Sequence, residues 1–334
     1  MLTYNSSAPT EVTKDPTSEA ALWLGTVLLK YCLNTSLALC AVVNNTINMI
    51  VFCRLGITTG INQNFLLLSV SDSLYGIIQT ILCGGLIGNE LGWWTSRLLP
   101  SSFYKLGFTI SSVPHFASII LTTVIAIIRC YSVVMPLKVK VNLTPRRQLA
   151  IILLPFCIYI GFSSNVFFCL GLTWHFNSVM NFSQLTLTPC REFSGRQRLL
   201  DFCRSLLLYT AFTTVAVCLV VLLLALKHSS RFKGKKSSAS ANNRRDIQVI
   251  KTVILVSAIF VFCNLPAMAV AFMRQMWPSF KLRGQLGRSF QLALLYLETN
   301  TLVNACSNIL VFYSSSSLYR KAFHGMFHHV EKNP

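Results

Sequence analysis

Seven long apolar stretches limit most strongly what this 334-residue chain can fold into. A helix that crosses a membrane needs roughly 20 predominantly apolar residues, and each stretch provides that length. Charged residues make up only 12% of the chain, about half the share that is usual in a soluble domain. The expected spans are, in order, about Ala21–Cys53, Asn64–Ile87, Phe103–Val134, Leu149–Leu172, Leu199–Leu226, Ile247–Met273 and Phe290–Tyr313. The sequence therefore predicts an all-α membrane protein, built as a bundle of seven transmembrane helices.

The basic residues are distributed unevenly around these spans. With the N-terminus outside, the inner segments hold 17 lysines and arginines and two acids, whereas the outer segments hold 12 and six. This bias follows the positive-inside rule. It predicts a plasma-membrane protein with an extracellular tail over residues 1–20, a bundle over 21–313 and a cytoplasmic segment over 314–334. The net charge of +19 is then explained by anionic lipid at the inner face, and no nucleic-acid partner is expected.

The two ends of the chain carry further signals. The first 20 residues have no apolar core of the kind found in a cleaved secretory signal, so the first span is expected to direct insertion. Asn5 and Asn181 begin glycosylation sequons on the expected outer side. After the last span, Leu318, Phe323 and Phe327 alternate with basic residues. This pattern predicts a short amphipathic helix that lies on the inner leaflet.

Two carboxylates, Asp72 and Glu298, stand within apolar spans. A charged side chain at such a position costs roughly 2.5–3.5 kcal/mol on insertion scales, so each carboxylate needs a cation, a proton or a partner. On the third span, Ser111, His115 and Ser118 fall on one helical face, because their spacing matches the helical repeat. We expect that polar face to point into the bundle.

Three residues mark the expected inner end and the sixth span. Arg129 closes the apolar part of the third span, and Asp246 lies 20 residues before Pro266. A helix of that length is about 30 Å long, which places Asp246 at the level of Arg129. Pro266 removes a backbone hydrogen bond in mid-helix and should kink the sixth span.

Cys190 lies in the longest outer loop, where the environment is oxidising. We expect it to form a disulfide bond. Cys83, at the outer end of the second span, is the first choice of partner, and Cys203 is the second. Most other cysteines lie in apolar spans, where they are expected to pack as small buried hydrophobic residues.

The spacing of the polar residues resembles that of the rhodopsin-like (class A) G-protein-coupled receptors over nearly the full chain. The matching patterns are Asn45 nine residues before Arg54, LSVSD with Asp72, Arg129 followed by MPL, FVFCNLP with Pro266, Asn304-x-x-x-Asn308, and Tyr319-Arg320-x-x-Phe323. The resemblance implies a receptor that senses an extracellular ligand and activates a heterotrimeric G protein. The sequence shows no catalytic pair or nucleophile constellation, so an enzyme is not expected.

The chain also departs from the pattern of that family. Ile128 and Cys130 replace the acid and the tyrosine beside the arginine, Asn264 replaces the tryptophan of the sixth helix, and Ile309 replaces a proline. The top of the third span has no cysteine. With these losses, the segments VNNTINMIVF and SNILVFYSSSSLYR are most similar to the divergent chemosensory-type receptors of gastropod molluscs. Ser111 stands where amine receptors carry an aspartate, which argues against an amine ligand.

The resemblance assigns roles to three groups of residues. A sodium ion would be held by Asp72, Ser118, Asn304 and Asn308, and no other cofactor is expected. The switch that couples to the G protein would involve Arg129, Asp246, Asn264, Pro266, Phe312 and Tyr313. An Arg129–Asp246 ion pair is expected in the resting state. The register of the seventh span would direct Glu298 toward a ligand, with Ser111, His115, Tyr296 and Asn300 near it.

A rim of basic residues surrounds the expected mouth of the bundle. Its members are Arg191, Arg196, Arg198, Arg274, Lys281, Arg283 and Arg288. Such a rim steers anionic groups toward the entrance, so we expect a small polar or zwitterionic ligand or a short peptide. Two alternatives remain at this point. One is a transporter or channel that uses Asp72 and Glu298 for ion or substrate binding, and the other is a receptor-like protein that no longer signals.

Overall fold

The computed structural model describes residues 15–57, 60–92, 101–135, 138, 144–177, 182–233, 241–282 and 284–328. Within some of these ranges, among them 241–249, it describes the backbone alone. The side chain of Asp246 and the residues Asn5, Asn181 and Arg283 therefore lie outside the described part of the chain.

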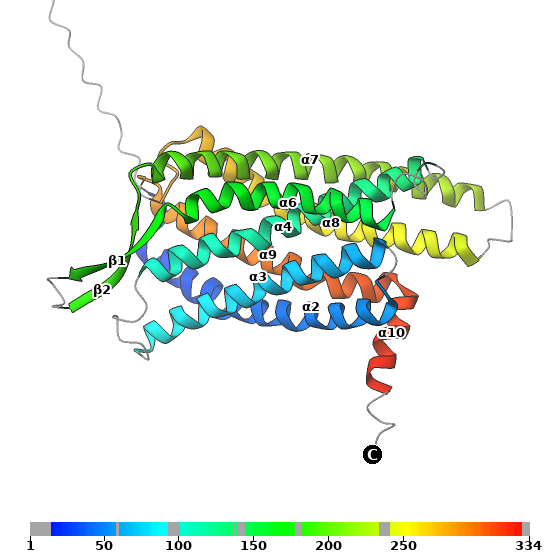
Figure 1. The fold of residues 1–334 in the computed structure, drawn as a ribbon, viewed down its shortest axis with the longest axis horizontal. Coiled ribbons are helices and arrows are strands. Elements are labelled where there is room, and N and C mark those ends of the chain that lie inside the picture. The colour runs from blue at the N-terminus through cyan, green and yellow to red at the C-terminus, as the bar shows by residue number, and fades with distance from the viewer. Residues whose placement is uncertain are drawn as a thin grey trace, which may run out of the picture.

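In the part of the chain that the structure describes, seven long helical segments lie side by side in a bundle (Figure 1). The first segment is a continuous run of α1 (Glu19–Gly25), the π-helix η1 (Thr26–Asn34) and α2 (Thr35–Leu55). The others are α3 (Gly60–Glu90), α4 (Ser101–Val134), α6 (Pro145–Phe167), α7 (Phe193–Lys233), α8 (Ala241–Met276) and α9 (Gly287–Ser315). Each predicted span falls on one of these segments, so the predicted fold class is confirmed.

Six of the segments are both long and apolar enough to cross a membrane. The seventh, α9, has 29 residues, more than α6 with 23, but it is not among the helices that are apolar enough by composition, and it packs against α2 and α8. Large apolar side chains cover the outside of the bundle. Examples are Val43, Ile81, Leu154, Phe262 and Leu310. An apolar exterior of this kind suits lipid hydrocarbon rather than water.

The chain between the fourth and fifth long segments folds into a β-hairpin that sequence analysis missed. Strand β1 (Leu170–Asn177) pairs with β2 (Phe182–Pro189) in antiparallel fashion, with Leu170 opposite Pro189. The predicted fourth span therefore ran too far, because the helix ends at Phe167. We call this end of the bundle, on the left in Figure 1, the hairpin end.

A short helix, α10 (Ser317–His328), follows the seventh segment at the opposite end and turns away from the bundle axis (Figure 1). The predicted helix after the last span is thus confirmed. Tyr319 anchors it, because this ring is buried against Phe52 and Phe312. Its hydroxyl donates a hydrogen bond to Asn48 Oδ1 at 2.5 Å. We call this the α10 end.

Polar contacts fix the position of α9 against the first segment. Asn45 Nδ2 donates to the Ala305 carbonyl at 3.0 Å, and the Thr299 hydroxyl donates to Asn34 Oδ1 at 2.7 Å. Side-chain amides and hydroxyls often join helices in this way inside a membrane. These contacts determine which face of α9 points into the bundle, and therefore where Glu298 lies.

The chain before α1 is also attached to α9. The Asp15 carboxylate accepts hydrogen bonds from the backbone amides of Arg288 and Ser289, at 2.8 and 3.3 Å, and from the Ser289 hydroxyl at 2.6 Å. The first amides of a helix have no partner within the helix. The Asp15 carboxylate provides an acceptor for two of these amides. The Arg288 guanidinium in addition contacts Glu19 at 3.0 Å.

Candidate ligand site

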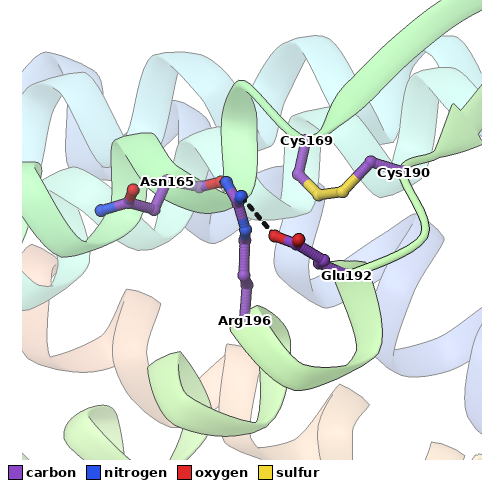
Figure 2. The surroundings of a disulfide bond; sticks show 5 residues. All are labelled: Asn165, Cys169, Cys190, Glu192 and Arg196. Atoms are coloured by element: carbon purple, nitrogen blue, oxygen red, sulfur yellow. Dashed lines mark hydrogen bonds and ion pairs between the residues drawn. A yellow bond between two sulfur atoms is a disulfide. The ribbon is translucent and has the colours of Figure 1, made fainter.

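A disulfide bond between Cys169 and Cys190 closes the base of the hairpin, with the two Cα atoms 5.1 Å apart (Figure 2). Cys190 is oxidised as expected, but the choice of Cys83 as its partner was wrong. Cys83 is a fully buried free thiol in α3, and Cys203 is also free. The reason is the strand register, since the pair Leu170–Pro189 places the next residues outward, Cys169 and Cys190, opposite each other.

An ion pair lies next to this disulfide (Figure 2). Arg196 Nη2 contacts Glu192 Oε2 at 2.6 Å, and Arg196 Nη1 reaches the Asn165 carbonyl at 3.4 Å. These contacts join the start of α7 to the end of α6. Arg196, expected to attract ligands from the rim, is therefore already paired with the residue that precedes its own helix.

A cavity of about 250 Å³ opens between the helices toward the hairpin end. Its polar and charged lining consists of Tyr75, Gln79, Ser111, Ser112, His115, Asp201, Arg204, Ser205, Arg274, Glu298 and Thr301. Apolar side chains, among them Phe108, Phe116 and Leu208, complete the wall. The structure thus brings three of the predicted ligand residues, Ser111, His115 and Glu298, around one cavity.

Tyr296 and Asn300 are not among the residues that line this cavity, so the structure does not bring them together with Ser111 and His115 there. Each is two residues from Glu298, and two residues along an α-helix correspond to a rotation of about 200°. Tyr296 is accordingly 50% exposed. The Asn300 amide donates to the Tyr296 carbonyl within α9 at 2.9 Å.

Arg204 dominates one side of the cavity, and sequence analysis did not single it out. Its Nη2 donates to Ser112 Oγ at 2.7 Å and its Nε to the Tyr159 hydroxyl at 3.2 Å. The guanidinium also lies 5.8 Å from the centre of the Phe116 ring. Arg204 lies roughly three turns into α7. An arginine inside a membrane helix is itself a signal of function, and Arg204 lies within the expected fifth span, Leu199–Leu226, so this signal was present in the sequence.

Asp201 connects Arg204 with a second arginine. Its carboxylate lies 3.7 Å from Arg204 Nη1 and 2.6 Å from Arg274 Nη2. Arg274 is about half exposed at the end of α8. This side of the cavity therefore holds two guanidinium charges and one carboxylate among its described residues. The excess of one positive charge favours an anionic group.

Glu298 lies on the other side of the cavity and forms an ion pair with Lys30 of η1. Both side chains are nearly buried, with 11% of Lys30 and 15% of Glu298 exposed. The carboxylate thus has the partner that its position in a membrane span requires. Sequence analysis named Glu298 but not Lys30, because pairing between distant helices does not appear in the sequence.

A second, much smaller space of about 10 Å³ lies beside Asp72. Ser118, Asn264 and Asn304 line it, and Asn308 Nδ2 donates to the Asp72 carboxylate at 2.7 Å. The space is close to what one water-sized particle needs. Carboxylate, hydroxyl and amide oxygens are the ligands that hard cations prefer. These residues fit a sodium ion, which stays a prediction.

The predicted switch residues are spread along the bundle. Asn264 Nδ2 donates to the Phe260 carbonyl at 2.9 Å, and Pro266 lies inside α8. Arg129 is half-buried toward the α10 end of α4. The expected pairing of Arg129 with Asp246 involves a side chain outside the described residues.

Two aromatic residues of this predicted switch lie at the end of α9. The Phe312 ring is buried at the α10 end, with its centre 5.1 Å from that of Phe52 and 4.7 Å from that of Phe65. The Tyr313 hydroxyl lies 3.1 Å from His324 Nε2 of α10. Phe312 therefore belongs to the packed core, whereas Tyr313 connects α9 to the following helix.

Comparison with protein families shows that residues 34–308 match the model of the 7 transmembrane receptor (rhodopsin family). The chain belongs to this family. The match extends from the end of η1 to Asn308 in α9 and so includes the more polar seventh segment. No curated protein sequence matches the chain.

Family membership confirms the resemblance drawn from the sequence at the level of the rhodopsin family. The chain is thus a multi-pass membrane receptor, and nothing supports the alternative of a transporter or channel. The narrower similarity to molluscan chemosensory receptors is not confirmed. The cavity between the helices is then the candidate ligand site of this receptor.

Proposed function

We propose that this receptor binds a small ligand with an anionic group and activates a heterotrimeric G protein. The observation that carries the proposal is the charge of the cavity. Arg204 and Arg274 share one carboxylate on one side, while Glu298 on the other side is already neutralised by Lys30. The cavity therefore has a net positive charge, and an anionic group gains most from entering it.

The size of the cavity supports a small ligand. Its volume of about 250 Å³ is below the range of roughly 300–1,000 Å³ that is typical of pockets for drug-sized molecules. Ser111 and His115 offer hydrogen bonds to the remaining polar groups of such a ligand. This arrangement narrows the sequence-based expectation of a polar or zwitterionic ligand to a small carboxylate or a comparable anion, a chemistry suited to a chemosensory receptor.

The proposal places the hairpin end outside the cell and the α10 end in the cytoplasm. The support is the charge bias between the sequence segments, since 17 of the 29 basic residues fall in segments that are expected to be cytoplasmic. In this orientation the cavity is reached from outside, and Arg129 faces the G protein. We further propose the plasma membrane as the location.

The test is a screen of small carboxylates, phosphates and N-acylated amino acids on cells that express the receptor with promiscuous G proteins. A hydrogen bond to a charged group contributes roughly 1.5–3 kcal/mol. Each 1.4 kcal/mol corresponds to a tenfold change. Arg204→Gln should therefore require about 10- to 100-fold more of every active ligand.

Arg198→Gln is the matched control, because Arg198 lies on the same helix but donates to the Ser194 carbonyl and does not line the cavity. Surface expression of each variant is measured alongside. If neither Arg204→Gln nor Arg274→Gln changes the potency of any active ligand, the ligand binds elsewhere. Ligand binding without nucleotide exchange on any G protein would favour a receptor that no longer signals, as the departures at Ile128 and Asn264 suggest.

A further inference from the structure

Lys30 occupies an unusual element of the structure. It lies in the middle of η1, a run of nine residues in π-helical conformation. Such turns are rare, and they occur frequently at functional sites. Lys30 and Asn34 are the buried residues of this segment, and they lie four residues apart. They share the face that packs against α9, where Lys30 meets Glu298 and Asn34 meets Thr299.

The ion pair has a definite orientation relative to the cavity. Glu298 lines the cavity, whereas Lys30 is not among the described residues that do so. The ion pair therefore meets the cavity through its carboxylate. The Thr35 hydroxyl donates to the Lys30 carbonyl at 3.2 Å, and the Thr299–Asn34 hydrogen bond lies one turn away. The backbone that carries Lys30 is thus held in place on the side of α9.

The pair has a consequence for recognition. A carboxylate exposed to a cavity is the natural partner of a ligand ammonium group, but Glu298 already has an ammonium partner. A second ammonium placed at Glu298 would stand close to that of Lys30, and like charges repel. Built-in repulsion of this kind is a common source of specificity, because it excludes unwanted ligands.

We propose that Lys30 determines the ligand specificity of the cavity. Its ammonium group, tethered to the chain, occupies the position beside the Glu298 carboxylate that a ligand cation would otherwise take. In the wild type, Lys30 fills this place and excludes ligands that carry an ammonium group. Without Lys30, Glu298 becomes a free binding site for amines. This inference rests on the proposed function only in taking the cavity as the ligand site. Its test uses amines, whereas the test of the anionic ligand class uses carboxylates.

The experiment measures the thermal unfolding midpoint of purified full-length receptor in lipid nanodiscs. Lys30→Ala removes the tethered amine, and ethylammonium chloride is the probe that can replace it. Ligand that binds the folded state raises the midpoint in a saturable manner. We expect a rise of about 3 °C in Lys30→Ala. In the wild type we expect no rise beyond that produced by equal sodium chloride.

The matched control is the double variant Lys30→Ala with Glu298→Gln, which has the same space but no carboxylate. Equal rises in the single and double variants, or no rise in the single variant, would overturn the proposal. Lys30→Gln provides a second route if Lys30→Ala does not fold, because glutamine keeps a long stem and can donate to Glu298. This variant should show a saturable rise of the midpoint with ethylammonium, which the wild type lacks. The absence of such a rise in a folded Lys30→Gln variant counts against the proposal.

The same preparation separates this inference from the proposed function. Propionate should stabilise the wild type and Lys30→Ala alike, and Arg204→Gln should remove that effect. A response to ethylammonium without any response to propionate supports the role of Lys30 and removes the anionic ligand class. The opposite result leaves the anionic ligand class in place and removes the role of Lys30.

Discussion

Breaking the Cys169–Cys190 disulfide should loosen the hairpin while the helical bundle stays folded. The two cysteines are 21 residues apart in sequence. Closing a loop of that length removes entropy from the open state worth about 3 kcal/mol at 25 °C. Because each 1.4 kcal/mol is a factor of ten, the open hairpin should become about 100- to 200-fold more populated. The strand pairs between Leu170 and Pro189 remain available to the variant.

Limited proteolysis measures this opening directly. Arg191 follows Cys190 and is a site for trypsin. When opening is fast compared with cleavage, the cleavage rate follows the population of the open form. Cys190→Ser should therefore raise the rate of cleavage at Arg191 by up to about 10²-fold in receptor held in nanodiscs.

Three controls make this prediction sharp. Cys169→Ser should match Cys190→Ser, and the double variant should add nothing, because both single changes remove the same bond. Cys203→Ser, a free thiol in the same helix as Arg196, should behave as the wild type. If Cys83→Ser accelerates cleavage as Cys190→Ser does, while Cys169→Ser has no effect, the pairing described above is wrong.

Three further predictions concern the carboxylates of Asp72, Asp246 and Asp15. Sodium should raise the unfolding midpoint of the wild type but not of Asp72→Asn, and equal rises would remove the sodium site. Asp246→Ala should raise basal signalling at equal surface expression, because it removes the ion pair with Arg129 that is expected in the resting state. Such a pair contributes about 1 kcal/mol or less if it is partly exposed. Unchanged basal signalling counts against the pair. The third prediction concerns the pKa of Asp15. Desolvation raises this pKa, but hydrogen bonds from Ser289 and neighbouring amides outweigh it and lower the pKa to about 2. A lowered pKa gives stability that is present above the unfolded value near 3.8 and is lost as the pH falls toward 2. The protection of the Ser289 amide against hydrogen exchange reports whether the segment before α1 stays attached to α9. This protection should be constant from pH 7 to about 5. A loss of protection at pH 6 would contradict the prediction.

The sequence was sufficient for the seven helices, because apolar runs of membrane length leave little choice of structure. Its errors lie where the pattern changes at the edge of the membrane. Leu170–Leu172 continued an apolar run but belong to a strand. The signal was present, since Leu185 and Leu187 alternate with Thr186 and Thr188 in β2, and alternation is typical of strands. Missing the hairpin also meant missing Cys169 as the disulfide partner.

The candidate site was only partly predictable, for a different reason. Periodicity within one helix correctly grouped Ser111 with His115, and applied to α9 it would have separated Tyr296 from Glu298. Contacts between helices are another matter, because they depend on how far each helix is shifted and rotated against its neighbours. No pattern in the sequence therefore indicates that Lys30 in the first span pairs with Glu298 in the seventh.

The partner of Glu298 changes what this carboxylate means for function. Read alone, a buried carboxylate near a ligand cavity indicates a site for a ligand cation. With Lys30 in place the same carboxylate contributes no net charge, and the cavity takes its sign from Arg204, Arg274 and Asp201. The two interpretations predict opposite ligand classes from the same side chain. On the proposed role of Lys30, the specificity of this receptor depends on a residue of η1 that is not among the described residues of the cavity lining. Exchanging Lys30 for alanine should therefore add amines to the ligands that the cavity accepts, while Arg204 still binds anions.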